Sequence, residues 1–242
     1  MEIAGYELGE LLGEGAYGEV RLGRREDQLV ALKRCKDLDL LALRRFFREL
    51  LVLRQLRHEH VVRLRDAVMQ VTELFLVLEL AECDLEHAIR YNLLSSTEQQ
   101  RVAEHLLGAL SYVHGLGLMH RDVKPANVLL EGLQGDLKAR LCDFGMVQHS
   151  KAKAFSEYVG MRWYRAPEVL LGHTYGCGAD VWSYGCVVAE MALGRPLLAG
   201  IDQEESARFM RNALFRSSWG SLQAVWASPE SMRPHPRWCT MD

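Results

Sequence analysis

The sequence predicts an α+β protein in which a small, strand-rich part precedes a larger, mostly helical part. Two observations carry this prediction. Over roughly the first eighty residues, short runs rich in apolar residues are separated by glycine or by charged turns, which is typical of a small sheet. After Asp84 the apolar residues recur at steps of three and four, which is typical of helices.

The strand-rich part is expected to contain strands at residues 6–12, 19–23, 29–34, 61–69 and 74–80. One helix is expected between the third and fourth strands, at residues 40–56. Its apolar residues share one face of such a helix, namely Leu43, Phe46, Phe47, Leu50, Leu53 and Leu56.

The later part is expected to contain a helix at residues 98–114, with Thr97 as its N-cap and Gly115 at its end. Residues 179–193 are apolar enough for a buried helix, and residues 202–215 predict a shorter amphipathic one. From Ser217 onward the periodic pattern is lost.

Length, charge and cysteine content narrow the class of protein. The 242 residues suit one large domain or one compact domain of two lobes. The net charge of −3 gives no general attraction to nucleic acid or membrane, and the six cysteines form no Cys-x-x-Cys pair that would indicate zinc or a disulfide framework. Without a signal segment or an apolar run near ~18 residues, we expect an intracellular protein of the cytoplasm or nucleus, with neither nucleic acid nor membrane as partner.

Two short strings carry most of the functional information. Residues 120–127 read His-Arg-Asp-Val-Lys-Pro-Ala-Asn, and residues 143–145 read Asp-Phe-Gly. Alone, the three-residue string usually marks a turn. Together, the strings resemble the catalytic loop and the metal-binding motif of the eukaryotic protein kinases, at the separation found in that family.

This resemblance implies a role for each polar residue in phosphoryl transfer. The reaction mainly requires alignment of the attacking oxygen and neutralisation of spreading charge. Asp122 would accept the proton of a substrate hydroxyl, and Lys124 would steady the transferred phosphate. Asn127 and Asp143 would each hold Mg²⁺.

Residues 12–20 contain a G-x-G-x-x-G pattern, whose glycines let backbone amides approach phosphate oxygens. The same pattern opens dinucleotide-binding folds, where the last glycine begins a helix. Here a strand-like run follows it, which favours a kinase-type loop between two strands. The resemblance implies that this loop binds ATP through Leu12, Gly13, Glu14, Gly15, Ala16, Tyr17, Gly18, Glu19 and Val20.

Ala31-Leu32-Lys33 resembles the family's strand lysine, which pairs with the α- and β-phosphates. Glu49, on the following helix, would anchor Lys33. Without this positional match, Lys33 would be an ordinary surface lysine and Glu49 a solvated charge.

Residues 75–85 resemble the strand and hinge that join the two kinase lobes. By this match the backbone of Glu79 and Ala81 would bond adenine and Asp84 would face the ribose. Val20, Ala31 and Leu129 would enclose the base, although aliphatic residues on strands are more often ordinary core.

Residues 156–168, ending in Arg-Trp-Tyr-Arg-Ala-Pro-Glu, resemble the activation segment of the group that contains the mitogen-activated and cyclin-dependent kinases. This implies that an upstream activating kinase phosphorylates Ser156 and Tyr158. It also implies that the chain is proline-directed, with a preference for a proline just after the phosphorylated Ser or Thr of its substrates. The phosphates would be received by Arg121, Arg162 and Arg165. Met161 departs from the family, which has a threonine there.

We therefore predict a two-lobed protein kinase-like fold over residues 6–216, with lobes at about 6–81 and 84–216. It would be incomplete at the C-terminus, because the resemblance fades after residue 200 and leaves 217–242 as an unassigned tail. The predicted function is transfer of the γ-phosphoryl of ATP to Ser or Thr of protein substrates, with Mg²⁺. The alternative is a catalytically impaired module that binds nucleotide or partners as a scaffold. The sequence identifies no cyclin or docking partner.

Overall fold

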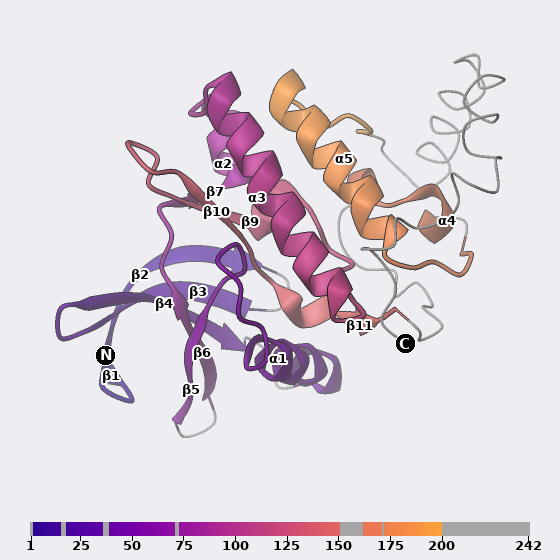
Figure 1. Cartoon of the computed structure of the whole chain (residues 1–242). Helices are drawn as coiled ribbons and strands as arrows, with labels where there is room; N and C mark the ends of the chain where they lie inside the picture. Colours follow the sequence, from indigo (N-terminus) through magenta and orange to yellow (C-terminus); the bar gives the residue numbers. More distant parts are fainter. Residues whose placement is uncertain are drawn as a thin grey trace, which may run out of the picture.

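The computed structural model describes residues 2–15, 18–35, 39–70, 73–150, 162–170 and 172–199. Within them it confirms the predicted α+β class: a twisted antiparallel sheet with one helix beside it is followed by a mostly helical part (Figure 1).

In the described residues, the larger sheet has six strands in the order β1-β2-β3-β4-β6-β5, and all of its neighbours are antiparallel. The strand predicted at residues 61–69 begins later, because Val61 forms an isolated bridge with Leu141. The strands are β1 (Glu2–Ile3), β2 (Tyr6–Gly15), β3 (Gly18–Arg25), β4 (Gln28–Cys35), β5 (Leu64–Gln70) and β6 (Glu73–Glu79).

Apolar side chains cover both faces of this sheet, because successive residues of a strand point to opposite sides. On β4, Val30 and Leu32 belong to a small cluster with Ile3 and Tyr6. Ala31, between them, belongs to the large core that continues into the helical part of the chain. The sheet and the helices therefore share one core on the side where Ala31 lies.

The helix beside the sheet, α1 (Leu40–Leu53), begins at Asp39, whose carboxylate accepts hydrogen bonds from the backbone nitrogens of Leu41 and Ala42, each at 2.8 Å. It ends earlier than the predicted range of 40–56, and Leu56 is buried in the turn that follows. Its inner face buries Ala42, Arg45, Phe46, Glu49 and Leu53.

The helical part contains two long helices, α3 (Ser96–Gly115) and α5 (Gly178–Leu193), which lie side by side (Figure 1). The helix predicted at residues 179–193 is thus confirmed. Short elements surround them: α2 (Leu85–Arg90), α4 (Pro167–Leu170), and the 3-10 turns η1 (Pro125–Asn127), η2 (Phe144–Met146) and η3 (Arg162–Tyr164). Strand order is β10-β9-β7 in one small sheet and β11-β8 in another, from β7 (Cys83–Asp84), β8 (Leu118–Met119), β9 (Val128–Glu131), β10 (Lys138–Leu141) and β11 (Gln148–His149).

The prediction that Thr97 caps α3 is wrong, because Ser95 holds that position. The Ser95 hydroxyl accepts from the backbone nitrogen of Glu98, and the Glu98 carboxylate accepts in return from the backbone nitrogen of Ser95 at 2.8 Å. This reciprocal capping box satisfies two backbone donors, which Thr97 could not do from inside the first turn.

Several predictions lie outside the described residues. They are the helix at 202–215, the tail at 217–242 and the incomplete C-terminus of the domain. The lobe boundaries at 6–81 and 84–216 stay predictions. None of the helices in the described ranges is both long and apolar enough to cross a membrane.

Candidate active site

The loop at residues 120–127 is held in place by α5. Asp180, almost fully buried in the first turn of this helix, accepts hydrogen bonds from the backbone nitrogens of His120 and Arg121, each at 2.8 Å. It also bonds His114 Nε2 at 2.8 Å. Burial raises the pKa of Asp180, but these partners outweigh burial and lower it overall. Asp180 therefore fixes the loop backbone and does not cap α5, where Cys177 holds the N-cap position.

His120 links this loop to the segment that carries Asp143. Its Nδ1 accepts from the backbone nitrogen of Asp122 at 3.3 Å, so Nε2 carries the proton and donates to the carbonyl oxygen of Cys142 at 2.9 Å. The buried ring also meets the Phe144 ring edge to face, with centroids 4.8 Å apart. Both candidate catalytic strings are thus joined through one imidazole.

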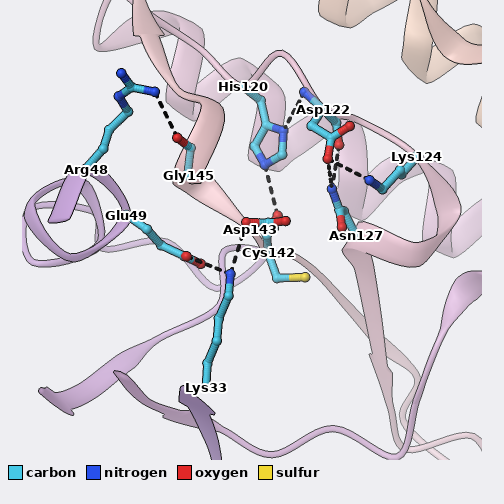
Figure 2. Close-up of polar contacts among 10 residues, drawn as sticks. All are labelled: Lys33, Arg48, Glu49, His120, Asp122, Lys124, Asn127, Cys142, Asp143 and Gly145. Carbon is cyan, nitrogen blue, oxygen red and sulfur yellow. Dashed lines mark hydrogen bonds and ion pairs between the residues drawn. The ribbon is translucent and has the colours of Figure 1, made fainter. Parts of the chain in front are cut away.

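Asp122, Lys124 and Asn127 form one compact group (Figure 2). Oδ2 of Asp122 accepts from Lys124 Nζ at 2.7 Å and from Asn127 Nδ2 at 2.9 Å. Asn127 Nδ2 also donates to the backbone carbonyl of Asp122 at 2.7 Å. Because both acceptors take the amide nitrogen, the amide oxygen of Asn127 points away and stays available to a ligand.

Lys33, Glu49 and Asp143 form a second group (Figure 2). Lys33 Nζ donates to Glu49 Oε2 at 2.6 Å and to Asp143 Oδ1 at 3.0 Å. The ion pair expected between Lys33 and Glu49 is therefore present. The three side chains come from β4, from α1 and from the residue just before η2, so this contact ties the sheet to the helical part.

Electrostatics favour the charged forms of Lys33 and Asp143. Burial alone lowers the pKa of Lys33, but the carboxylates of Asp143 and Glu49 outweigh it and raise that pKa above its ordinary value. Burial raises the pKa of Asp143, yet the Lys33 ammonium outweighs burial and lowers it to about 2. Burial raises the pKa of Glu49, and Lys33 counteracts only part of this rise.

The turn that holds Asp143 is strained and packed against α1. Asp143 has φ +60°, in the left-handed region that non-glycine residues rarely adopt. Two residues later, Gly145 packs beside α1, where an added Cβ would be in ordinary van der Waals contact with the Cβ of Arg45 at 3.5 Å.

Sequence reasoning missed Arg48 as a residue of this site. Its Nη1 donates to the carbonyl oxygen of Gly145 at 3.0 Å (Figure 2). Arg48 directly precedes Glu49, so α1 supports both Lys33 and the Asp143 turn. The available signal was its position beside Glu49 on the same helix.

The glycine-rich loop connects two strands, as expected. Gly15 ends β2 and pairs with Gly18 at the start of β3, so the last glycine of the pattern begins a strand. This excludes the dinucleotide-binding alternative. A Cβ on Gly18 would lie 2.5 Å from the Arg34 carbonyl oxygen, so only glycine fits there. Ala16 and Tyr17 lie outside the described residues.

The remaining loop residues have mixed surroundings. Leu12 is 45 % exposed on β2, Gly13 pairs with Val20, and Glu14 pairs with Glu19. The Glu19 carboxylate forms ion pairs with Arg21 and Arg34, both at 3.1 Å, so it already has structural partners.

The apolar residues predicted to enclose a base lie on elements that lead to the candidate site. Ala31 is buried and pairs with Leu78 of β6, while Val20 and Leu129 are partly buried against the same core. Leu129 pairs with Asp84 across β9 and β7. Their positions agree with a base site and equally with ordinary core packing.

The segment predicted as the hinge runs from β6 to α2. The backbone nitrogen of Glu79 donates to the Arg63 carbonyl at 3.2 Å, and Ala81 is partly exposed. Asp84 caps α2 by accepting from the His87 nitrogen at 2.7 Å, a role that the sequence analysis did not assign. One carboxylate oxygen of Asp84 is thus committed to the helix.

Ser156, Tyr158 and Met161 lie outside the described residues. The described end of the same segment is fastened to α5: the Tyr164 hydroxyl donates to Glu190 at 2.7 Å, and the Ser183 hydroxyl donates to the Tyr164 carbonyl at 2.6 Å.

Of the predicted phosphate receivers, Arg121 donates to Gln148 and lies over the Tyr175 ring, 5.8 Å from its centroid. The side chain of Arg162 lies outside the described residues, and Arg165 is partly buried.

A family profile for the protein kinase domain matches residues 6–237. Mitogen-activated protein kinase 4 of Oryza sativa subsp. japonica is 37% identical over 227 residues, which cover 88% of this chain and 61% of that protein. Mitogen-activated protein kinase 2 of Arabidopsis thaliana is 38% identical over 216 residues, covering 84% of this chain and 57% of that protein. Mitogen-activated protein kinase 2 of Pneumocystis carinii is 35% identical over 223 residues, covering 86% of this chain and 63% of that protein.

The chain thus spans about three fifths of the length of these curated relatives. The match to the profile includes the glycine-rich loop, Lys33, the loop at 120–127 and the Asp-Phe-Gly turn. The chain therefore belongs to the protein kinase family and, within it, to the group of the mitogen-activated and cyclin-dependent kinases.

Proposed function

We propose that the chain is a protein serine/threonine kinase that transfers the γ-phosphoryl of ATP to hydroxyl groups of protein substrates, with preference for sites followed by proline. The observation that carries this proposal is the meeting of Lys33 with both Glu49 and Asp143, beside the Asp122 group. The likeness to mitogen-activated protein kinases supports the substrate class.

The donor atoms present fit Mg²⁺, which prefers oxygen ligands. Asp143 is ionised, and only its Oδ1 is bonded to Lys33, which leaves Oδ2 for a metal. The amide oxygen of Asn127 faces away from Asp122. We propose that these two oxygens hold Mg²⁺, which when bound neutralises phosphate charge during transfer.

Each of the chain's own residues would then have a separate role in phosphoryl transfer. Asp122 keeps Oδ1 free of hydrogen bonds in the described structure, so it can accept the proton of a substrate hydroxyl. Lys124, bonded to Oδ2 of the same carboxylate, would stabilise charge on the phosphoryl group. Lys33, held charged by two carboxylates, would orient the α- and β-phosphates, and the backbone of Gly13, Gly15 and Gly18 would approach the phosphates.

The adenosine part would be bound by the backbone of Glu79 and Ala81, by Asp84 at the ribose and by Val20, Ala31 and Leu129 around the base. The register that places Ala31 beside Leu78, and Leu129 beside Asp84, supports this assignment. We propose that the protein acts inside the cell, in the cytoplasm or nucleus, as the family likeness suggests.

We propose further that an upstream kinase activates the chain by phosphorylating Ser156 and Tyr158. Each phosphate would add roughly −1.5 to −2 charge. The arginines at 121, 162 and 165 would receive it. The hydrogen bond from Tyr164 to Glu190 supports this proposal, because it anchors the C-terminal end of the segment to α5. Phosphorylation would then need to order only the residues before this anchor.

The deciding experiment is a transfer assay beside a binding assay. The 242-residue chain, alone and after treatment with an activating kinase, is incubated with γ-labelled ATP, Mg²⁺ and a basic protein substrate. Phosphoamino-acid analysis follows, and Lys138→Met, at an exposed position on β10, is the matched control for Lys33→Met.

A kinase labels serine or threonine, and Lys33→Met loses the label while Lys138→Met keeps it. If the chain binds ATP by calorimetry yet transfers nothing in either state, the scaffold alternative is correct and the proposed enzyme is rejected.

A further inference from the structure

The carboxylate of Glu82 binds a turn that lies 50 positions away in the sequence. Its Oε1 accepts from the backbone nitrogen of Gly132 at 2.9 Å, and its Oε2 accepts from the backbone nitrogen of Leu133 at 3.3 Å. The backbone nitrogen of Glu82 donates to the carbonyl oxygen of Leu130 at 2.9 Å. Glu82 is therefore joined to the hairpin of β9 and β10 through both its backbone and its side chain.

The turn that receives this carboxylate is shaped for an anion. Gly132 has φ +75°, in the left-handed region, and an added Cβ would lie 2.4 Å from the carbonyl oxygen of Asp136. Successive backbone N–H groups in a turn of this kind form a small concavity that binds anions. Hydrogen bonds from N–H groups to a carboxylate are stronger than those to a neutral acceptor. The turn after β9 thus offers a site for an anion, and Glu82 fills it.

This contact connects the two walls of the proposed base site. Glu82 directly follows Ala81, whose backbone is proposed to bond adenine. The opposite wall is formed by Leu129, which lies on β9 and precedes Gly132 by less than one strand length. A shift of the hairpin relative to the segment 79–82 would therefore change the space that is left for the base.

The contact made by Glu82 is tighter than the one at the start of the same segment. There, the carboxylate of Glu79 lies 3.7 Å from Arg140 Nε and 4.0 Å from Arg65 Nη2. Both distances exceed hydrogen-bond length, so these ion pairs restrain Glu79 only loosely. Each carboxylate oxygen of Glu82, by contrast, accepts a hydrogen bond from the turn. Its side chain is directed at the hairpin, so it can act on a nucleotide only through the backbone.

We propose that Glu82 is a positioning residue for adenine: by binding the turn after β9, it fixes the separation between the backbone of Ala81 and the side chain of Leu129. This inference rests on the proposed function, which has ATP bound between these two walls. A binding segment that is already held in its bound conformation loses less entropy when the ligand arrives. Removal of the Glu82 carboxylate should therefore weaken the binding of ligands that contain adenine, without slowing the transfer step.

The test measures nucleotide affinity and turnover separately on the full chain. Displacement of a fluorescent ATP analogue gives the Kd of ATP and of adenosine, and a phosphotransfer assay gives kcat and KM for ATP. Glu82→Ala should raise both Kd values by the same factor, roughly three- to tenfold, because it removes two hydrogen bonds. KM should rise while kcat stays the same, as expected when ground-state and transition-state binding are weakened equally. Lys33→Met, at the proposed phosphate contact, should weaken ATP but not adenosine.

Further variants separate positioning from a general loss of stability. Glu82→Gln keeps one acceptor oxygen and should recover part of the lost affinity. Gly132→Ala disturbs the other half of the contact, so it should reproduce the loss for both ligands. Asp136→Ala removes a negative charge from the same turn, at an exposed position, and should leave both Kd values as in the wild type. Circular dichroism of each variant checks that it is folded.

Three outcomes overturn the proposal. If Glu82→Ala binds ATP and adenosine as tightly as the wild type, Glu82 does not position adenine, while binding and transfer by the wild type leave the proposed function intact. If Asp136→Ala loses as much affinity as Glu82→Ala, the effect comes from the charge of the turn and not from the contact. If the wild type binds neither ATP nor adenosine, the proposed function itself is rejected, and this inference with it.

Discussion

Arg48 donates a hydrogen bond to the carbonyl oxygen of Gly145, with Nη1 3.0 Å from the oxygen. Because Glu49 follows Arg48 on the same helix, α1 is bound to the site at two points. Glu49 pairs with Lys33 on the sheet, and Arg48 bonds the turn that holds Asp143.

The first prediction concerns this bond. Arg48→Ala should raise the Mg²⁺ concentration needed for half-maximal phosphotransfer, because the Asp143 turn loses a restraint worth about 1 kcal/mol, or roughly fivefold. Arg48→Lys, which can still donate to the carbonyl, should restore part of the effect. Arg44→Ala, one turn earlier on α1, is the control. An unchanged Mg²⁺ requirement in Arg48→Ala would show that the bond does not position Asp143.

The second prediction concerns Asp180. Asp180→Asn replaces one acceptor oxygen by an amide group that faces backbone donors, so it should lower the free energy of unfolding by about 1–3 kcal/mol. Turnover should fall as well, because the loop from His120 loses its anchor. Urea denaturation measures the change, and Asp136→Asn, at an exposed turn, is the control. Equal unfolding curves for the two variants would contradict this assignment.

The third prediction concerns pH. The rings of His60 and His105 stack with centroids 3.9 Å apart, and His105 Nδ1 accepts from the Ala139 nitrogen at 3.2 Å, which requires the neutral ring. Burial, with help from His60 and Arg101, lowers the pKa of His105, while Glu59 and Glu104 oppose the shift. Burial also lowers the pKa of His58.

For a base whose pKa is lower in the folded state, the unfolded chain binds more protons as the pH falls below the ordinary histidine value of about 6.5. The free energy of unfolding is therefore highest above that pH and decreases as the pH falls below it. Urea denaturation between pH 7.5 and 5.5, values chosen to bracket about 6.5, should show this loss. His105→Asn keeps an acceptor for the Ala139 nitrogen and should make the free energy of unfolding depend less on pH. The control His173→Asn, at an exposed position, should leave the pH dependence as in the wild type. Equal pH dependence in the two variants would contradict this explanation.

The fourth prediction concerns activation. If phosphorylation of Ser156 and Tyr158 orders their segment, the double change Ser156→Ala with Tyr158→Phe should hold activity at the level of the untreated chain after incubation with an activating kinase. Mass spectrometry of the treated wild type should find phosphate on both residues. Activation of the double variant to the wild-type level would reject this switch.

Much of the fold and site could be predicted because the relevant signals are local. The short apolar runs of β4 and β6, and the spacing of apolar residues in α1, depend only on neighbouring residues. The pairing of Lys33 with Glu49 followed from matching two motifs to one family.

Contacts between distant segments could not be predicted in this way. The bond from Arg48 to Gly145 joins residues 97 positions apart, and an arginine offers no local sign of which carbonyl it will meet. The histidine stack likewise depends on how α3 packs beside the turn after α1. The prediction of Thr97 as the N-cap was wrong because several residues near the start of α3 can cap, and only backbone geometry decides among them.

The most direct measurement of the central claim compares Asp122→Asn with the wild type in phosphotransfer and in ATP binding. The amide can still accept from Lys124 and Asn127 but cannot take up the substrate proton, so turnover should fall by about 10²–10⁴-fold. Calorimetry with ATP and Mg²⁺ should give nearly equal affinities, because Asp122 is not proposed to hold nucleotide. Undiminished turnover in the variant would contradict the assignment of Asp122 as the base and, with it, the proposed mechanism.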